Sequence, residues 1–292
     1  MNITTIPEEA MANATLTSPI YTAITPKVTG MLSLMGSALI FLDGIQTLRR
    51  TSDGLVSGTY HRMMVGMSVF DITSSMCHIL STWALPIESG AFQAMGSQGT
   101  CKAQGFFSEV GNMAVVLYNA TLCMYQLLTI RIGWKEYGIS KIELMFHVIP
   151  ILVGLTMGIM GLVKNIYGPA GHMCWYVPEK TGGLFRLIHL GIIWFAIIFV
   201  AIGMLLIYWE VRRLDHAMKI YNVRRSSILT AKELKEKRKA ERRGSKTRKV
   251  AERAMLLMGA MFFSWVPITV SYQSLCLIIF PAIHRRNWCT LI

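Results

Sequence analysis

Stretches of about 20 apolar residues recur along this chain of 292 residues and constrain its fold more than any other feature. A helix needs about 20 such residues to cross the roughly 30 Å hydrocarbon core of a bilayer. Backbone groups in lipid must be satisfied internally, so these stretches are helices, and the ten-residue alternating strands of a membrane barrel are not visible. We predict an all-α, polytopic transmembrane helix bundle over residues 28–283. Its six predicted spans lie at about 28–48, 62–86, 103–130, 142–163, 187–209 and 254–280.

The distribution of positive charge predicts how the bundle is oriented. The segment 212–253 contains 16 of the 29 Lys and Arg residues, whereas the loop 87–102 contains only Lys102 and the tail 1–27 only Lys27. Positive loops stay on the cytoplasmic side, so 212–253 is predicted to be cytoplasmic and the N-terminal tail extracellular, which suits a plasma-membrane protein. Because the net charge of +13 is explained in this way, it does not point to a nucleic-acid partner.

Two cysteines fall on the predicted outer side. Cys101 lies where the third span begins, and Cys174 lies in the loop between the fourth and fifth spans. Both face an oxidising compartment in this topology, so we predict a disulfide that links the third span to that loop. The remaining cysteines lie mostly inside predicted spans, where free buried thiols are expected.

The N-terminal tail contains two N-glycosylation sequons, Asn2-Ile3-Thr4 and Asn13-Ala14-Thr15. The tail is polar and lacks the basic-then-apolar pattern of a cleaved signal peptide. Glycosylation at Asn2 and Asn13 is therefore predicted and agrees with an extracellular N-terminus.

Three polar residues inside predicted spans are candidate functional residues, because burying a charge there costs roughly 2.5–3.5 kcal/mol or more. Asp71 lies deep in the second span and is either a polar or ion-binding hub that tunes a conformational equilibrium or an interhelical hydrogen-bonding residue. Glu109 and Asn112 lie two and three turns below Cys101. Each is either a contact for an extracellular ligand or a contact between helices.

The sixth predicted span carries Trp265 two residues before Pro267. Proline removes a backbone donor and clashes with the preceding turn, so we expect a kink at this point. The pair is either a hinge that lets the cytoplasmic half of the helix move or an ordinary membrane proline beside an aromatic residue.

The basic loop 212–253 contains two Arg-Arg-x-Ser sequences, which end at Ser227 and Ser245. Phosphate on either serine would subtract nearly two charges from a surface that should attract anionic lipid or an acidic partner. The loop is either a solvated segment lying against the bilayer or a docking surface for a cytoplasmic partner.

Together these features resemble a G-protein-coupled receptor. The resemblance covers about residues 28–280 and rests on the cysteine pair, the Cys174-Trp175 dipeptide, Asp71, Trp265-Val266-Pro267 and the basic loop. The third span is most similar to that of cyclic-AMP-receptor-like and secretin-like members.

The resemblance implies a seven-helix receptor architecture, an extracellular ligand and a heterotrimeric G protein as cytoplasmic partner. Signalling would proceed through movement of the Pro-kinked sixth helix. The predicted ligand contacts are Glu109, Asn112, Trp175 and Trp265.

The chain departs from the family pattern in two places. Tyr125-Gln126-Leu127 stands where rhodopsin-like receptors have Asp-Arg-Tyr, and no seventh apolar stretch precedes the short C-terminal tail 284–292. We therefore expect weak or no signalling from this form.

The alternative is a six-helix transporter or channel subunit, although the two halves differ sharply in loop length and charge, whereas transporter halves tend to be symmetric. No enzyme is predicted, because no H-E-x-x-H, G-x-S-x-G or glycine-rich phosphate loop is present. No cofactor is expected, and the scattered histidines predict no metal site.

Overall fold

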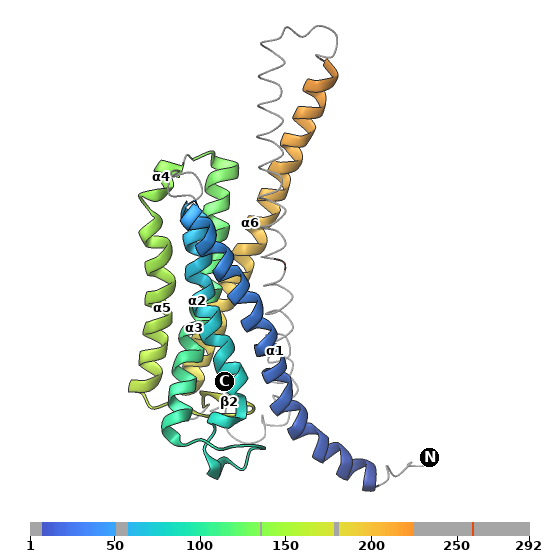
Figure 1. Cartoon of the computed structure of the whole chain (residues 1–292), viewed down its shortest axis with the longest axis vertical. Coiled ribbons are helices and arrows are strands. Elements are labelled where there is room, and N and C mark those ends of the chain that lie inside the picture. Colours follow the sequence, from blue (N-terminus) through green and yellow to red (C-terminus); the bar gives the residue numbers. More distant parts are fainter. Residues whose placement is uncertain (1–7, 51–57, 135, 178–180, 225–258, 260–292) are drawn as a thin grey trace.

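The computed structural model describes residues 8–50, 58–134, 136–177, 181–224 and 259. Five long helices dominate these ranges (Figure 1): α1 (Glu8–Arg50), α2 (Gly58–Leu80), α3 (Gln98–Gln126), α5 (Glu143–Val163) and α6 (Gly182–Arg224). The short elements are η1 (Ser81–Ala84), η2 (Ile87–Ser89), the π-helical η3 (Leu127–Ile132), α4 (Glu136–Ser140), and the strands β1 (Tyr167–Ala170) and β2 (Met173–Tyr176).

Each of the long helices, together with η1 after α2 and η3 after α3, provides a segment long and apolar enough to cross a membrane. These segments are Ala23–Arg49, Gly58–Ala84, Gln98–Ile132, Glu143–Val163 and Gly182–Arg213. The predicted polytopic helix bundle is confirmed, and the first five predicted spans each overlap one segment. The sixth predicted span, 254–280, lies outside the described residues except for Gly259.

Two helices extend beyond the spans predicted for them. α1 already begins at Glu8, within the predicted tail 1–27, and α6 continues to Arg224, within the predicted loop 212–253. Charge counts locate the membrane surface rather than the helix end. No glycine or proline between Arg212 and Arg224 stops α6.

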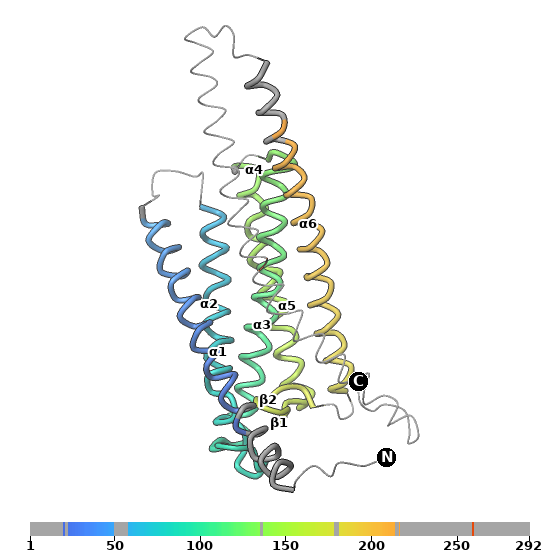
Figure 2. The backbone as a smooth tube through the Cα atoms, turned by 90° about the vertical axis from the view of Figure 1, so that its right-hand side faces the viewer, coloured from blue at the N-terminus to red at the C-terminus, as the bar shows by residue number. Residues whose placement is uncertain are grey.

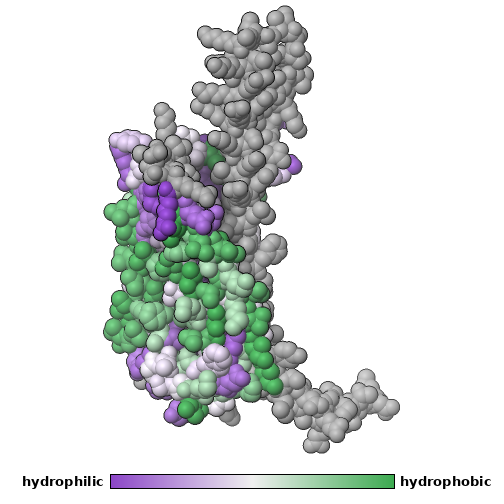
Figure 3. Space-filling model, viewed as in Figure 1, coloured by the Kyte–Doolittle hydropathy of each residue, from purple (hydrophilic) through white to green (hydrophobic). Residues whose placement is uncertain are grey.

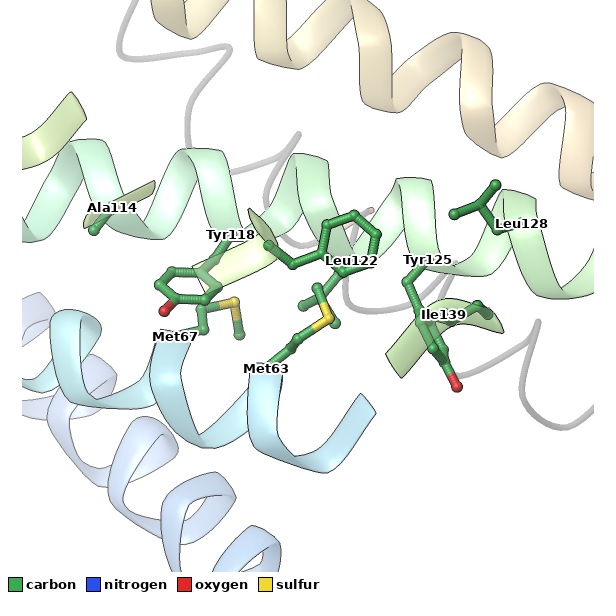
Figure 4. Close-up of a cluster of buried hydrophobic side chains, with 9 residues drawn as sticks. Met63, Met67, Ala114, Tyr118, Leu122, Tyr125, Leu128 and Ile139 are labelled. Atoms are coloured by element: carbon green, nitrogen blue, oxygen red, sulfur yellow. The ribbon is translucent and has the colours of Figure 1, made fainter. Parts of the chain in front are cut away.

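Helix α3 forms the centre of the bundle. It contacts α2, α5, α6 and both strands, and 56% of its most apolar segment is buried, against 17% for α1. Figure 2 shows α3 flanked by α2, α5 and α6, with α1 on the outside. In Figure 4, Met63 and Met67 of α2 lie against Tyr118 and Leu122 of α3.

An apolar surface surrounds this core. Figure 3 shows a broad hydrophobic band between more polar ends of the molecule. Large apolar side chains are exposed on several helices, as for Leu39 of α1 (67%), Leu152 of α5 (60%) and Phe195 of α6 (71%). Exposure on this scale is unusual for a soluble monomer and is what a lipid-facing surface requires.

A two-stranded hairpin covers one end of the bundle, in the loop that joins α5 to α6. β1 and β2 are antiparallel and are joined by the two-residue turn Gly171-His172. Gly171 has φ +74°, and such tight turns favour glycine where φ is positive. This hairpin was not predicted from the sequence.

The Tyr167 side chain of β1 packs between α3 and α5 and so positions the hairpin. A Cβ atom on Gly105 of α3 or on Gly161 of α5 would lie 2.5 Å from the Tyr167 ring, so both positions require glycine. The Tyr167 hydroxyl donates to the Gly158 carbonyl at 3.1 Å, and its ring stacks on Tyr176 with centroids 5.2 Å apart. Burial raises the pKa of Tyr167, so its hydroxyl stays protonated and able to donate.

Candidate functional site at the hairpin end

A disulfide cross-links the hairpin end of the bundle, which is the end formed by Cys101, Cys174 and the strands β1 and β2. Cys101 and Cys174 form a disulfide with Cα atoms 5.3 Å apart, and both residues are fully buried. The predicted disulfide is confirmed. It fastens β2 to the first turn of α3.

Glu109 lies directly below the hairpin and joins three elements. Its side chain is fully buried on α3, and one carboxyl oxygen accepts from Trp175 Nε1 of β2 at 3.0 Å. The other oxygen lies 2.7 Å from His189 Nδ1 of α6. A buried carboxyl group is stabilised by hydrogen bonds to both oxygens, and here these bonds tie α3, β2 and α6 together.

Trp175 is also held from above by Arg186 of α6. The guanidinium carbon lies 5.1 Å from the Trp175 ring centroid, in a cation–π arrangement, and Arg186 Nε donates to the Tyr176 carbonyl at 2.7 Å. Arg186 lies in the segment 164–186, which also contains Lys164 and Lys180. This segment is more basic than the other segments predicted to be extracellular. Its contacts with β2 give this positive charge a structural role.

Of the predicted ligand contacts, the structure brings Glu109 and Trp175 together but places Asn112 elsewhere. Asn112 Oδ1 accepts from Ser74 of α2 at 2.5 Å, and its Nδ2 donates to Ser108 at 3.2 Å. Asn112 therefore joins α3 to α2. Trp265 and Pro267 lie outside the described residues.

Asp71 of α2 faces α1, where its carboxylate accepts a hydrogen bond from Ser37. The Ser37 hydroxyl is nearly fully buried. This contact is an interhelical hydrogen bond, which was one of the two predicted roles of Asp71. Its role as a hub that tunes a conformational equilibrium stays a prediction.

Three of the four predicted modification sites lie outside the described residues. These three sites are Asn2, Ser227 and Ser245. The fourth, Asn13, lies in the first turns of α1. Most of the predicted basic loop also lies outside them. Among the described residues, no group of three or more His, Cys, Asp or Glu side chains could hold a metal ion.

Sequence reasoning missed Gln104 and His189. Gln104 carries no charge and stands in an apolar helix, so nothing in the sequence distinguishes it from a surface amide. His189 has no histidine or carboxylate partner at helical spacing. Its partner, Glu109, is 80 residues away in the sequence, so only the tertiary fold reveals the pair.

The opposite end of the bundle, here called the ion-pair end, is held by polar side chains. Arg62 of α2 forms an ion pair with Glu143 of α5, with Nη2 and Oε2 2.7 Å apart, and Thr59 donates to the same oxygen at 3.1 Å. One turn further along α5, His147 Nδ1 lies 3.0 Å from the Tyr118 hydroxyl of α3. By the charge distribution this end is predicted to be cytoplasmic.

No family model matches the chain. The sequence is 26% identical over 186 residues to "Frizzled/smoothened-like sans CRD protein A" of Dictyostelium discoideum, covering 58% of this chain and 31% of that protein. The chain thus spans about a third of this relative's length.

The fold is similar to that of squid rhodopsin, a G-protein-coupled receptor. The crystal structure superposes with a TM-score of 0.54 at 13% sequence identity, over 87% of this chain and 71% of rhodopsin. The sequence relative and the structural neighbour agree with the resemblance derived from the residues. This multi-pass membrane protein has a fold like that of the G-protein-coupled receptors.

Proposed function

We propose that this protein is a cell-surface receptor that transmits an extracellular ligand signal to a cytoplasmic partner through movement of a Pro-kinked sixth helix. Its fold is that of a receptor family, and the sequence relative is named as Frizzled/smoothened-like. The receptor-like neighbours argue by resemblance against an enzymatic function. A heterotrimeric G protein is the proposed partner.

The observation that carries the proposal is the position of Glu109. It links α3, β2 and α6 beneath the hairpin, so a ligand that displaced either Trp175 or His189 would change how three elements pack. A ligand shifts a conformational equilibrium only through its different affinities for the two states. Breaking one of these hydrogen bonds is a direct source of such a difference.

We further propose that the ligand contacts Trp175 and Trp265 as well as Glu109, and that Trp265 and Pro267 form the hinge. The N-terminus would lie outside, with Asn2 and Asn13 glycosylated. The basic loop would contact the G protein or anionic lipid and release it on phosphorylation of Ser227 or Ser245.

Reporter assays at matched surface expression test this function. Basal G-protein activation is measured for residues 1–292 and for a longer chain with an added C-terminal apolar span, with a rhodopsin-type receptor as positive control. We expect activation above background from at least one of the two chains. Trp265→Ala and Glu109→Gln should change that activation without reducing surface expression.

Silence of both chains across all reporter classes would reject the receptor function and favour the transporter or channel alternative. The topology is tested separately by adding protease to intact cells. The basic loop should be cleaved only after permeabilisation, and cleavage in intact cells would show that the orientation is wrong.

A further inference from the structure

We propose that Gln104 is a positioning residue, which orients β2 so that Trp175 meets Glu109 and which acts separately from the disulfide. The importance of that orientation rests on the proposed function. The orientation itself is a structural property and is tested without any signalling assay.

The side chain of Gln104 is almost completely buried and uses both its donor and acceptor groups. Its Nε2 donates to the carbonyls of Cys77 at 3.0 Å and Ser81 at 2.9 Å, at the end of α2. Its Oε1 accepts from the backbone N–H of Cys174 in β2 at 3.0 Å. One amide group on α3 therefore ties the hairpin to the end of α2.

The bonded carbonyls lie where α2 breaks. The last carbonyls of a helix have no helical donor, and the chain turns at Ser81, which is fully buried and has φ +42°. A non-glycine residue with positive φ is uncommon and persists where its surroundings fix it. The Ser81 hydroxyl also donates to the His172 carbonyl at 3.0 Å, so this break contacts the hairpin turn as well.

Gln104 and the disulfide restrain different parts of Cys174. The disulfide holds the side chain, and rotation about its single bonds does not by itself fix the direction of the Cys174 backbone. The hydrogen bond from the Cys174 N–H holds the backbone and removes this freedom. Trp175 follows directly in the sequence, so the direction of its indole depends on the restrained strand.

The first test replaces Gln104 by methionine, which is similar in size but makes no such hydrogen bonds. Hydrogen–deuterium exchange is followed in peptides covering residues 167–177 of the protein in nanodiscs, after mass spectrometry has verified the intact disulfide. We expect exchange roughly tenfold faster than in the wild type, because the buried Cys174 N–H in β2 loses its acceptor. The ¹⁵N-indole resonance of Trp175, assigned with Trp175→Phe, should shift.

The second test uses Gln104→Glu. An ionised carboxylate would face the carbonyls of Cys77 and Ser81 and could not donate to them, whereas the neutral acid donates to one of them and still accepts from Cys174. Exchange, corrected for its intrinsic pH dependence, should therefore be near wild type at low pH and should accelerate as pH rises.

The matched control is Gln98→Glu, the same change at an exposed position on the same helix. The titratable groups on the elements that surround Gln104 are retained in the control. They include His78 on α2, Lys102 and Glu109 on α3, Tyr167 and Tyr176 on the strands, His172 in the hairpin turn, and Arg186 and His189 on α6. Only pH dependence beyond the control counts as evidence for the role of Gln104.

Wild-type exchange in Gln104→Met would overturn the proposal, because the disulfide and the other hairpin contacts would then position β2 without Gln104. If Gln104→Met does not fold, Gln104→Glu decides, and exchange that follows the Gln98→Glu control at every pH would equally refute the role. A silent receptor assay would leave this result intact, so the two proposals fail separately.

Discussion

The two ends of the bundle are stabilised in different ways. At the hairpin end a disulfide, the buried amide of Gln104 and the buried carboxyl of Glu109 act together. At the ion-pair end the main tie is the Arg62–Glu143 pair, in which the arginine side chain is 47% exposed. An exposed ion pair contributes little, so this end is the more easily rearranged of the two.

The cytoplasmic end of α3, as predicted from charge, is irregular as well. It changes to a π-helix at Leu127, and the buried side chain of Gln126 just before it has no hydrogen-bond partner in the described part of the chain. π-helical segments inside helices occur frequently at functional sites. The two ends thus differ in how firmly they are held, a difference that the proposed function would use.

The largest expected effect comes from breaking the covalent link at the hairpin end. Cys101→Ser should lower the free energy of unfolding by roughly 2–5 kcal/mol, because the disulfide closes a long loop. Thermal unfolding in detergent measures this loss. The control is Cys123→Ser, a buried free cysteine on the same helix, and an equal loss in both variants would show that the link itself contributes little.

A smaller effect is expected near the ion-pair end from Tyr118→Phe. This change removes the hydroxyl that contacts His147 but keeps the ring packed against Phe70. We expect a loss of about 0.5–1.5 kcal/mol in stability, typical of one hydrogen bond. Hydrogen exchange of the hairpin should remain unchanged, and faster exchange there would show that the two ends are coupled.

Smaller still should be the coupling between Arg62 and Glu143. A double-mutant cycle with Arg62→Ala and Glu143→Gln should give roughly 0.2–1 kcal/mol, because Arg62 is half exposed and water screens its charge. The coupling should fall as salt is added. A salt-independent coupling of several kcal/mol would mean that this end is as firmly held as the hairpin end.

The smallest effect concerns pH at the hairpin end. Burial lowers the pKa of His172 from its ordinary value of 6.5, so the folded state disfavours the protonated imidazole. Its contribution to stability is complete above pH 6.5 and is lost as pH falls through the lowered pKa. His172→Gln should flatten the acid limb of a stability profile, and an unchanged limb would contradict the assignment.

The sequence predicted the parts of this molecule that follow from membrane physics. Apolar length located five helices, and charge placed Cys101 and Cys174 on one side, where they do pair. The hairpin was missed because its strands are only four residues long, so periodicity over Tyr167–Tyr176 carries almost no signal.

The candidate site was only partly predictable for a related reason. Sequence position showed that Glu109 and Asn112 share a helix, but not that one bonds β2 and α6 while the other bonds α2. The side that a polar residue faces is decided by the packing of its helix. Partners such as His189, far away in the sequence, become visible only in the fold.

The seat of Tyr167 between Gly105 and Gly161 has an evolutionary consequence. Because a methyl group on either glycine would overlap the ring, neither glycine can be replaced while Tyr167 keeps its place. Relatives with alanine at 105 or 161 should carry a smaller residue at 167, so the three alignment columns should covary although they lie on different elements. Relatives that keep the tyrosine beside two larger residues would show that the hairpin can sit higher on the bundle.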